Sequence, residues 1–268
     1  MSAPPPDRLR PLSELDAPAC AGVEGVLFDV DDTVTKDGRL ERVAYDALWA
    51  LRDAGLRLVA VTGRPLGWVD VLARHWPVDL AIGENGAGWV WREGERFREG
   101  YFDDAPTRER QRATLEDIAA AVAAELPVAR PASDQRARRC DLAFDVGEEV
   151  QLEPDEVAAL VAIIEGHGAR TTVSSVHCHA VPGAWDKAAG AARAIPAALG
   201  MPLEPAAWLF VGDSGNDEAA FARFPLSAAV ANLKREALRE AFPRFLARGG
   251  HGAGFAEIAE HLLRERAP

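Results

Sequence analysis

Hydrophobic and polar positions follow two different periods along the chain. Short apolar runs rich in β-forming residues are typical of buried parallel strands, whereas apolar residues at helical spacing indicate helices. The runs at 23–30, 56–63 and 78–83 predict strands, and the segments 41–55 and 65–76 between them predict helices. This β-α-β-α-β order predicts an α/β fold with a doubly wound parallel sheet.

The pattern changes after the third strand. A hairpin, a helix, a strand, a helix and a strand are predicted in that order, at 88–99, 105–125, 138–146, 155–166 and 169–181. This order is typical of an α+β unit. We therefore expect residues 85–180 to form an inserted second domain.

The α/β pattern then resumes, with alternating helices and strands at 186–199, 206–212, 216–224, 226–231 and 255–265. The expected core is thus split in sequence, into residues 21–84 and 181–268. The Pro-rich residues 1–20 predict a flexible tail.

The composition and net charge limit the classes of molecule that the protein can bind. The chain has 268 residues, of which 48% are hydrophobic, and its formal net charge is -12. An acidic surface argues against nucleic acid and against anionic membranes as partners. No apolar run approaches the roughly 18 residues of a membrane span, and the start lacks the apolar core of a signal peptide. We expect a cytoplasmic protein, a monomer or weak homodimer, whose cysteines are reduced, namely Cys20, Cys140 and Cys178.

Carboxylates follow several of the predicted strands. The carboxyl ends of parallel strands meet at one edge of a sheet, where such folds bind ligands. A lysine opens a helix nearby, and the polar residues expected at this edge are Asp29, Asp31, Thr62, Lys187, Asp213 and Asp217. Carboxylate oxygens without histidine or cysteine suit a hard cation, Mg²⁺ above all.

Simpler interpretations remain open for parts of this set. Acidic residues after a strand often form turns or cap helices, and Asp217 could cap the helix that follows it. A calcium loop does not fit, because Val34 and Leu40 stand where that loop needs glycine and glutamate. The glycine-rich segments do not match nucleotide-binding loops.

Four segments in order resemble the motifs of the haloacid dehalogenase superfamily of phosphohydrolases. They are "DVDDT" at 29–33, "VTGR" at 61–64, "DK" at 186–187 and "GDSGND" at 212–217. The "ENGA" at 84–87 is similar to a signature of the Cof-like, type IIB members. The resemblance implies a Rossmann-like core with an inserted cap of the C2 type. Among these members the chain most resembles the sucrose-phosphate phosphatase and mannosyl-3-phosphoglycerate phosphatase branch.

This resemblance implies a role for each matching residue. Asp29 would be the nucleophile and Asp31 the general acid and base, while Thr62 and Lys187 would hold the phosphoryl group. Mg²⁺ would be bound by Asp29, the backbone carbonyl of Asp31, and Asp213, with support from Asp217. Asp32 stands where many relatives have glycine, and Ala188 and Ala189 follow the lysine where Cof-like members often have glycine first.

The residues expected to bind substrate lie in the motifs and in the insertion. They are Thr62, Gly63, Arg64, Asn85, Gly86, His177 and Lys187. Within them, Asn85 with Gly86 could equally form a turn, and Arg64 could equally pair with surface acids. In the insertion, the polar face at 174–179 could hydrogen-bond a sugar. Arg136, Arg138 and Arg139 could recognise a second anionic group but are more typical of a solvated turn. Trp89 and Trp91 could stack on a sugar but are more typical of packing.

The sequence therefore predicts a Mg²⁺-dependent phosphatase that acts on a phosphorylated sugar or related small metabolite through an aspartyl-phosphate. Two alternatives stay open. One is a sugar phosphomutase or phosphotransferase of the same superfamily, and the other is a non-catalytic protein that binds a phosphorylated metabolite.

Overall fold

The computed structural model describes residues 9–174 and 176–266, and in this part of the chain three sheets form. The largest has nine strands, in the order β1 (Arg10–Pro11), β14 (Phe245–Leu246), β13 (Leu226–Ala229), β12 (Trp208–Gly212), β2 (Gly25–Phe28), β5 (Arg57–Val61), β6 (Leu80–Gly83), β7 (Gly88–Glu93) and β8 (Arg96–Tyr101). The strands from β1 to β6 in this order are parallel. The α/β fold and its parallel sheet are therefore confirmed.

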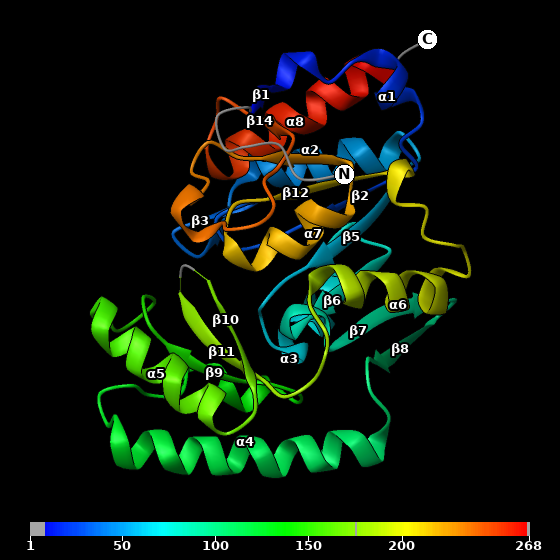
Figure 1. The fold of residues 1–268 in the computed structure, drawn as a ribbon. Helices are drawn as coiled ribbons and strands as arrows, with labels where there is room; N and C mark the ends of the chain where they lie inside the picture. The colour runs from blue at the N-terminus through cyan, green and yellow to red at the C-terminus, as the bar shows by residue number, and fades with distance from the viewer. Residues whose placement is uncertain (1–8, 175, 267–268) are drawn as a thin grey trace.

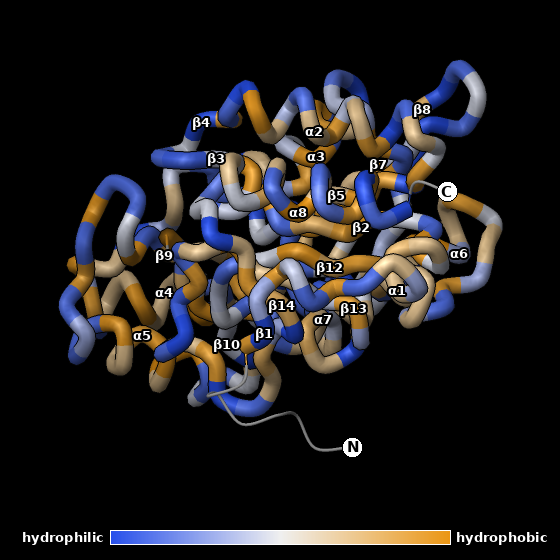
Figure 2. The backbone as a smooth tube through the Cα atoms, turned by 90° about the horizontal axis from the view of Figure 1, so that it is seen from above, coloured by the Kyte–Doolittle hydropathy of each residue, from blue (hydrophilic) through white to orange (hydrophobic). Residues whose placement is uncertain are grey.

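Helices cover both faces of this sheet (Figure 1). One group consists of α1 (Ala17–Ala21), α2 (Arg42–Asp53) and α8 (His251–Arg266), in which α1 and α2 each pack against α8. On the other side lie α6 (Lys187–Leu199) and α7 (Glu218–Arg223), while α3 (Leu66–His75) packs on β6 and β7. The central strands are hydrophobic along their length (Figure 2), and Leu27, Val59 and Val211 are fully buried. This core fixes where the strands end.

Part of the expected N-terminal tail is ordered, which corrects the sequence prediction. Residues 1–8 lie outside the described residues, but β1 pairs with β14, and α1 packs on α8. Leu12 and Leu15 are buried, and His261 Nε2 lies 2.7 Å from the Leu15 carbonyl oxygen. The sequence analysis missed the buried residues Leu12 and Leu15, because the segment is rich in proline and polar residues separate the two leucines.

The hairpin of β7 and β8 belongs to the large sheet and not to the insertion. The sequence analysis placed it after the boundary at residue 85, but β7 pairs antiparallel with β6, so that Ile82 faces Trp89. Trp89 and Val90 are buried in the same hydrophobic core as the parallel strands. For Trp89, packing is therefore the confirmed interpretation.

The inserted segment forms a smaller unit with its own core. Its sheet has the order β10 (Arg170–Val173), β11 (His177–Val181) and β9 (Leu142–Asp145), with α4 (Ala105–Glu125) and α5 (Pro154–Gly166) packed together beside it. Ile118, Phe144 and Leu160 lie in its hydrophobic core. Figure 1 shows this unit below the large sheet.

The strand predicted at 169–181 is in fact a hairpin. β10 and β11 pair antiparallel, and the Ser174 hydroxyl accepts the backbone N–H groups of Val176 and His177. Ser175, which the sequence analysis placed on the polar face, lies outside the described residues. A short second hairpin, β3 (Thr35–Lys36) with β4 (Arg39–Leu40), follows β2. Among the described helices, none is both long and apolar enough for a membrane span.

The ordered N-terminal segment generates a prediction about stability. Leu15→Ala should lower the free energy of unfolding by about 2 to 4 kcal/mol, because it removes a buried side chain and leaves a cavity. Urea denaturation would measure the change, with Ser13→Ala as the control on an exposed neighbour. A change below about 0.5 kcal/mol for Leu15→Ala would show that this segment is not part of the folded core.

Candidate active site

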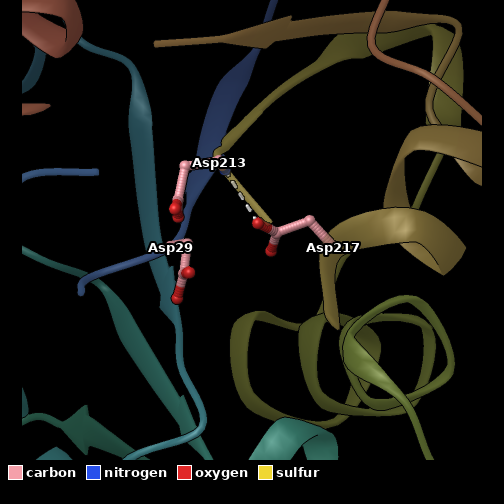
Figure 3. Close-up of side chains that lie close together, drawn as sticks. All are labelled: Asp29, Asp213 and Asp217. Atoms are coloured by element: carbon pink, nitrogen blue, oxygen red, sulfur yellow. Dashed lines mark hydrogen bonds between the residues drawn. The ribbon is translucent and has the colours of Figure 1, made fainter. Parts of the chain in front are cut away.

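Three buried carboxylates gather at the carboxyl ends of two neighbouring strands. Asp29 follows β2, Asp213 follows β12, and Asp217 lies in the 3-10 turn just before α7. Each offers an oxygen, and these oxygens lie within 4.8 Å of one another (Figure 3). The exposed fractions of the three residues are 3%, 1% and 0%. The sequence prediction that these distant segments converge is therefore met in the structure.

Lys187 supplies a positive charge to this cluster. It is the first residue of α6, and its Nζ lies 2.8 Å from Asp29 Oδ1 and 2.6 Å from Asp217 Oδ1. Burial lowers the pKa of Lys187, but Asp217 and Asp29 outweigh burial, so that the pKa is raised above its usual value. Lys187 is therefore a buried ammonium group.

The local backbone orients two of the acids. Asp217 Oδ2 accepts the N–H groups of Asp213 and Ser214, at 2.9 and 3.1 Å, so Asp217 closes its own turn. Asp29 Oδ1 accepts the N–H of Val30 at 2.8 Å. The expected side-chain cap on the following helix is not formed, because Asp217 makes no side-chain capping hydrogen bond to α7.

The charges of the site do not balance. Burial, followed by neighbouring carboxylates, raises the pKa of Asp213 well above its usual value. Burial also raises the pKa of Asp29 to about 7, although Lys187 opposes this shift. Asp213 Oδ1 accepts the Thr33 hydroxyl at 3.1 Å, but Asp213 Oδ2 is buried without a hydrogen-bond partner among the described residues. This unpartnered oxygen, in a set of carboxylate donors, fits a hard divalent cation.

A small pocket opens beside Asp29, between the core and the insertion. Its cavity volume is about 10 Å³. Its lining includes five of the predicted site residues, namely Asp29, Asp31, Gly63, Arg64 and His177. The insertion contributes His177 and His179 to the wall, and both are buried. Sequence reasoning did not select Ser214 and Asn216, which also line this pocket.

Other predicted residues lie next to the pocket and not in its wall. Asn85 and Lys187 line a neighbouring cavity, and Asn216 is common to both. Asn216 Nδ2 donates to Asn85 Oδ1 at 3.2 Å. Thr62 follows β5 and is fully buried, and its hydroxyl accepts the N–H of Arg64 at 3.0 Å. Its contact with a phosphoryl group stays a prediction, as does that of the Asp31 carbonyl with a metal.

Gly86 has a structural reason for lacking a side chain. Its φ is +110°, and an added Cβ would lie 2.3 Å from the Asp186 carbonyl oxygen, directly before Lys187. The glycine therefore allows α6 to approach the end of β6 closely.

Of the three arginines at 136–139, Arg136 and Arg139 are exposed, as in the predicted solvated turn, whereas Arg138 is buried. Arg138 is 8% exposed, and its guanidinium contacts Asp134 and Asp141 and donates to the Gly63 carbonyl oxygen at 2.9 Å. Arg139 pairs with Glu99 at 2.6 Å. Arg138 thus joins the insertion to the loop after β5, a contact that no local pattern indicates.

Comparisons with known proteins give a relative in sequence and several neighbours in fold. No model of a protein family matches the chain. The chain is 31% identical over 246 residues to a phosphoglycolate phosphatase of Pyrobaculum neutrophilum, and the match covers 90% of this chain and 96% of that protein. The sucrose-phosphatase of Synechocystis, solved with sucrose and phosphate, has a TM-score of 0.64 and 20% identity over 90% of this chain and 98% of that chain. A sugar phosphatase of HAD subclass IIB has a TM-score of 0.62 and 18% identity over 89% and 98%.

The unbalanced charge predicts an unusual gain in stability. Asp213→Asn should raise the free energy of unfolding of the metal-free protein at pH 8 by about 1 to 2 kcal/mol, because it removes one of three crowded negative charges. Because the pKa of Asp213 is raised in the folded protein, the folded state becomes less stable as the pH rises above the usual carboxyl range. The gain in stability from Asp213→Asn should therefore be smaller at pH 5 than at pH 8.

Denaturation in excess chelator would measure this gain. Asp117→Asn, on the exposed side of α4, is the matched control and should change stability little at either pH. A loss of stability in Asp213→Asn at pH 8 would contradict the crowding of charge.

Proposed function

We propose that this chain, which belongs to the haloacid dehalogenase superfamily in its Cof-like subclass IIB and is a phosphoric monoester hydrolase, dephosphorylates a small phosphorylated metabolite. The reaction would proceed through a phosphoaspartate on Asp29, with Mg²⁺ as cofactor. The observation that carries this proposal is the arrangement of Lys187 between Asp29 and Asp217, beside the unpartnered oxygen of Asp213.

Asp29 is suited to attack phosphorus. Its carboxylate is buried at the pocket wall and is held by Lys187 and by the N–H of Val30. A covalent intermediate divides one very slow hydrolysis into two easier steps. The ester oxygen leaves in the first step, and water releases phosphate from Asp29 in the second.

Asp31 is the proposed general acid and base. It lines the same pocket as Asp29, two residues further along the chain. In the first step its carboxyl group would give a proton to the leaving oxygen, and in the second it would take a proton from the attacking water.

The chain's own residues would hold the cation and the phosphoryl group. Asp29, Asp213 and Asp217 are the residues that would bind Mg²⁺, which when bound would offset the charge of the transferring phosphoryl group. Lys187 would neutralise a further phosphoryl oxygen while it holds Asp29 in place. Thr62 is proposed to hydrogen-bond the same group.

The polar wall of the pocket supports a short, polar leaving group. A cavity of about 10 Å³ holds roughly one water molecule, so the insertion must move to admit any ester. Its polar wall, which His177 and His179 line together with Asp29 and Asp31, would suit the hydroxyl or carboxylate groups of a short metabolite. A compound such as 2-phosphoglycolate, the substrate named for the curated relative, fits this description better than a disaccharide phosphate.

Asp29→Asn should lower kcat for phosphate release by about a thousandfold or more, because the amide cannot form the phosphoaspartate. The thermal unfolding midpoint should not fall, since Asn keeps the shape and removes one crowded charge. Asp37→Asn, an exposed neighbour on the turn between β3 and β4, is the matched control. Substantial activity in Asp29→Asn would refute the nucleophile assignment.

A substrate screen with a metal series should show phosphate release that chelator abolishes and Mg²⁺ restores. The esters are 2-phosphoglycolate, sucrose 6-phosphate, trehalose 6-phosphate and mannosyl-3-phosphoglycerate, and we expect the first to be hydrolysed with the highest kcat/KM. Hexose 1-phosphate with a bisphosphate primer tests for a mutase in parallel. Isomerisation without phosphate release, or activity indifferent to chelation, would contradict the proposal.

A further inference from the structure

Arg64 joins the proposed acid and base to the insertion. Its Nε and Nη2 donate to the carboxylate of Asp31 at 2.9 to 3.1 Å. Its Nη2 and Nη1 donate to the carboxylate of Glu148 at 2.8 and 3.1 Å, and Nη1 reaches Asp134 at 3.4 Å. Every N–H group of this guanidinium therefore has a carboxylate oxygen opposite it. In this arrangement Arg64 has no donor left for a substrate among the described residues.

The three partners come from the two parts of the molecule. Asp31 follows β2 of the core, whereas Asp134 and Glu148 belong to the insertion. The Arg64 side chain is 4% exposed and lies over the ring of Trp68, at 4.6 Å from its centroid. These contacts hold the guanidinium in one orientation, with Asp31 on its Nε–Nη2 edge and Glu148 on the adjacent Nη1–Nη2 edge.

Glu148 is itself held in place. The Asp145 carboxylate at the end of β9 accepts the N–H groups of Gly147, Glu148, Glu149 and Val150, at 2.8 to 3.2 Å. Glu148 Oε2 also lies 3.0 Å from Nε2 of His177, which lines the pocket. The backbone of this loop is therefore fixed, and it places the Glu148 carboxylate where Arg64 hydrogen-bonds it and His177 lies beside it.

These contacts exist only while the insertion covers the pocket. The cavity beside Asp29 holds about one water molecule, so a substrate can enter only when this wall moves away. Movement of the loop at 146–150 separates Glu148 from Arg64, and the long arginine side chain then regains rotamer freedom. The hydrogen bonds from Arg64 hold Asp31 in one orientation only while the Arg64 side chain is confined to one rotamer.

We propose that Glu148 is a positioning residue that, through Arg64, sets the orientation of Asp31 when the insertion closes. This inference rests on the proposed function. In the first step Asp31 transfers its proton to the ester oxygen as the P–O bond breaks and Asp29 bonds to phosphorus, so the alcohol leaves neutral. This transfer requires that the proton of Asp31 points at the ester oxygen. Glu148 orients Arg64, and through it Asp31, only when the insertion is closed.

Two aryl esters of similar size separate this role from a structural one. The leaving group of phenyl phosphate resembles tyrosine, whose pKa is about 10, and gains much from a proton. The leaving group of 4-nitrophenyl phosphate is a stable anion at neutral pH and gains little. Because kcat/KM reports only the steps through the first irreversible one, it isolates proton donation to the leaving group from the later hydrolysis of the phosphoaspartate.

Glu148→Gln should lower kcat/KM for phenyl phosphate by about tenfold and that for 4-nitrophenyl phosphate by less than about twofold. Glu149→Gln, which changes the same charge one residue along the loop, should leave both values unchanged. Thermal unfolding would confirm that both variants fold. An equal fall for the two esters, or no fall, would overturn the inference.

A double-mutant cycle tests whether Glu148 acts through Arg64. In an Arg64→Lys background, where one ammonium group replaces the forked guanidinium, Glu148→Gln should change kcat/KM for phenyl phosphate by less than about twofold. A further tenfold fall would show that Glu148 acts by another route. Absence of phosphate release from both esters by the unmodified protein would instead refute the proposed phosphatase, which distinguishes the two failures.

Discussion

The site depends on one ammonium group that faces three buried carboxylates. Moving an ion out of water costs several kcal/mol. For Lys187 this desolvation cost is offset by two ion pairs, to Asp29 at 2.8 Å and to Asp217 at 2.6 Å. Asp213 receives no such partner on its Oδ2. The fold therefore brings together more negative charge than its own lysine can balance, and a divalent cation or a proton must supply the remainder. The raised pKa of Asp29 and of Asp213 expresses the same deficit.

The position of Lys187 depends in turn on glycines that let backbones approach. A Cβ on Gly190 would lie 2.4 Å from the Cα of Gly86, so the first turn of α6 rests directly on the turn after β6. A Cβ on Gly212 would lie 2.4 Å from Asp217 Oδ2, so the end of β12 also needs glycine. Asp186 caps α6 by accepting the N–H of Ala189 at 2.7 Å. The alanines after Lys187 are thus compatible with an ordinary helix start.

The sequence alone predicted what depends on local pattern and on the parallel sheet. Apolar runs indicated the strands, and the rule that carboxyl ends share an edge brought Asp29, Asp213 and Asp217 together. It could not assign the hairpin after β6 to one unit, because a strand with apolar and aromatic residues has the same pattern in either unit. Nor could it find the partners of Arg64, since Asp134 and Glu148 are separated from it by 70 and 84 residues. Contacts between loops leave no period in the sequence.

Two of the contacts that hold the insertion against the core differ in how easily they open. The buried Glu84 carboxyl accepts the backbone N–H groups of Arg139, Cys140 and Asp141, at 2.6 to 3.2 Å. Separating Glu84 from these N–H groups would leave several buried polar groups without hydrogen-bond partners. Glu148, by contrast, is 30% exposed at its side chain, so water can replace Arg64 when that pair separates. The strand β9 runs from the first contact to the second. Admission of a substrate should therefore move the loop at 146–150 about a pivot near 139–141, which keeps the insertion attached while the pocket opens.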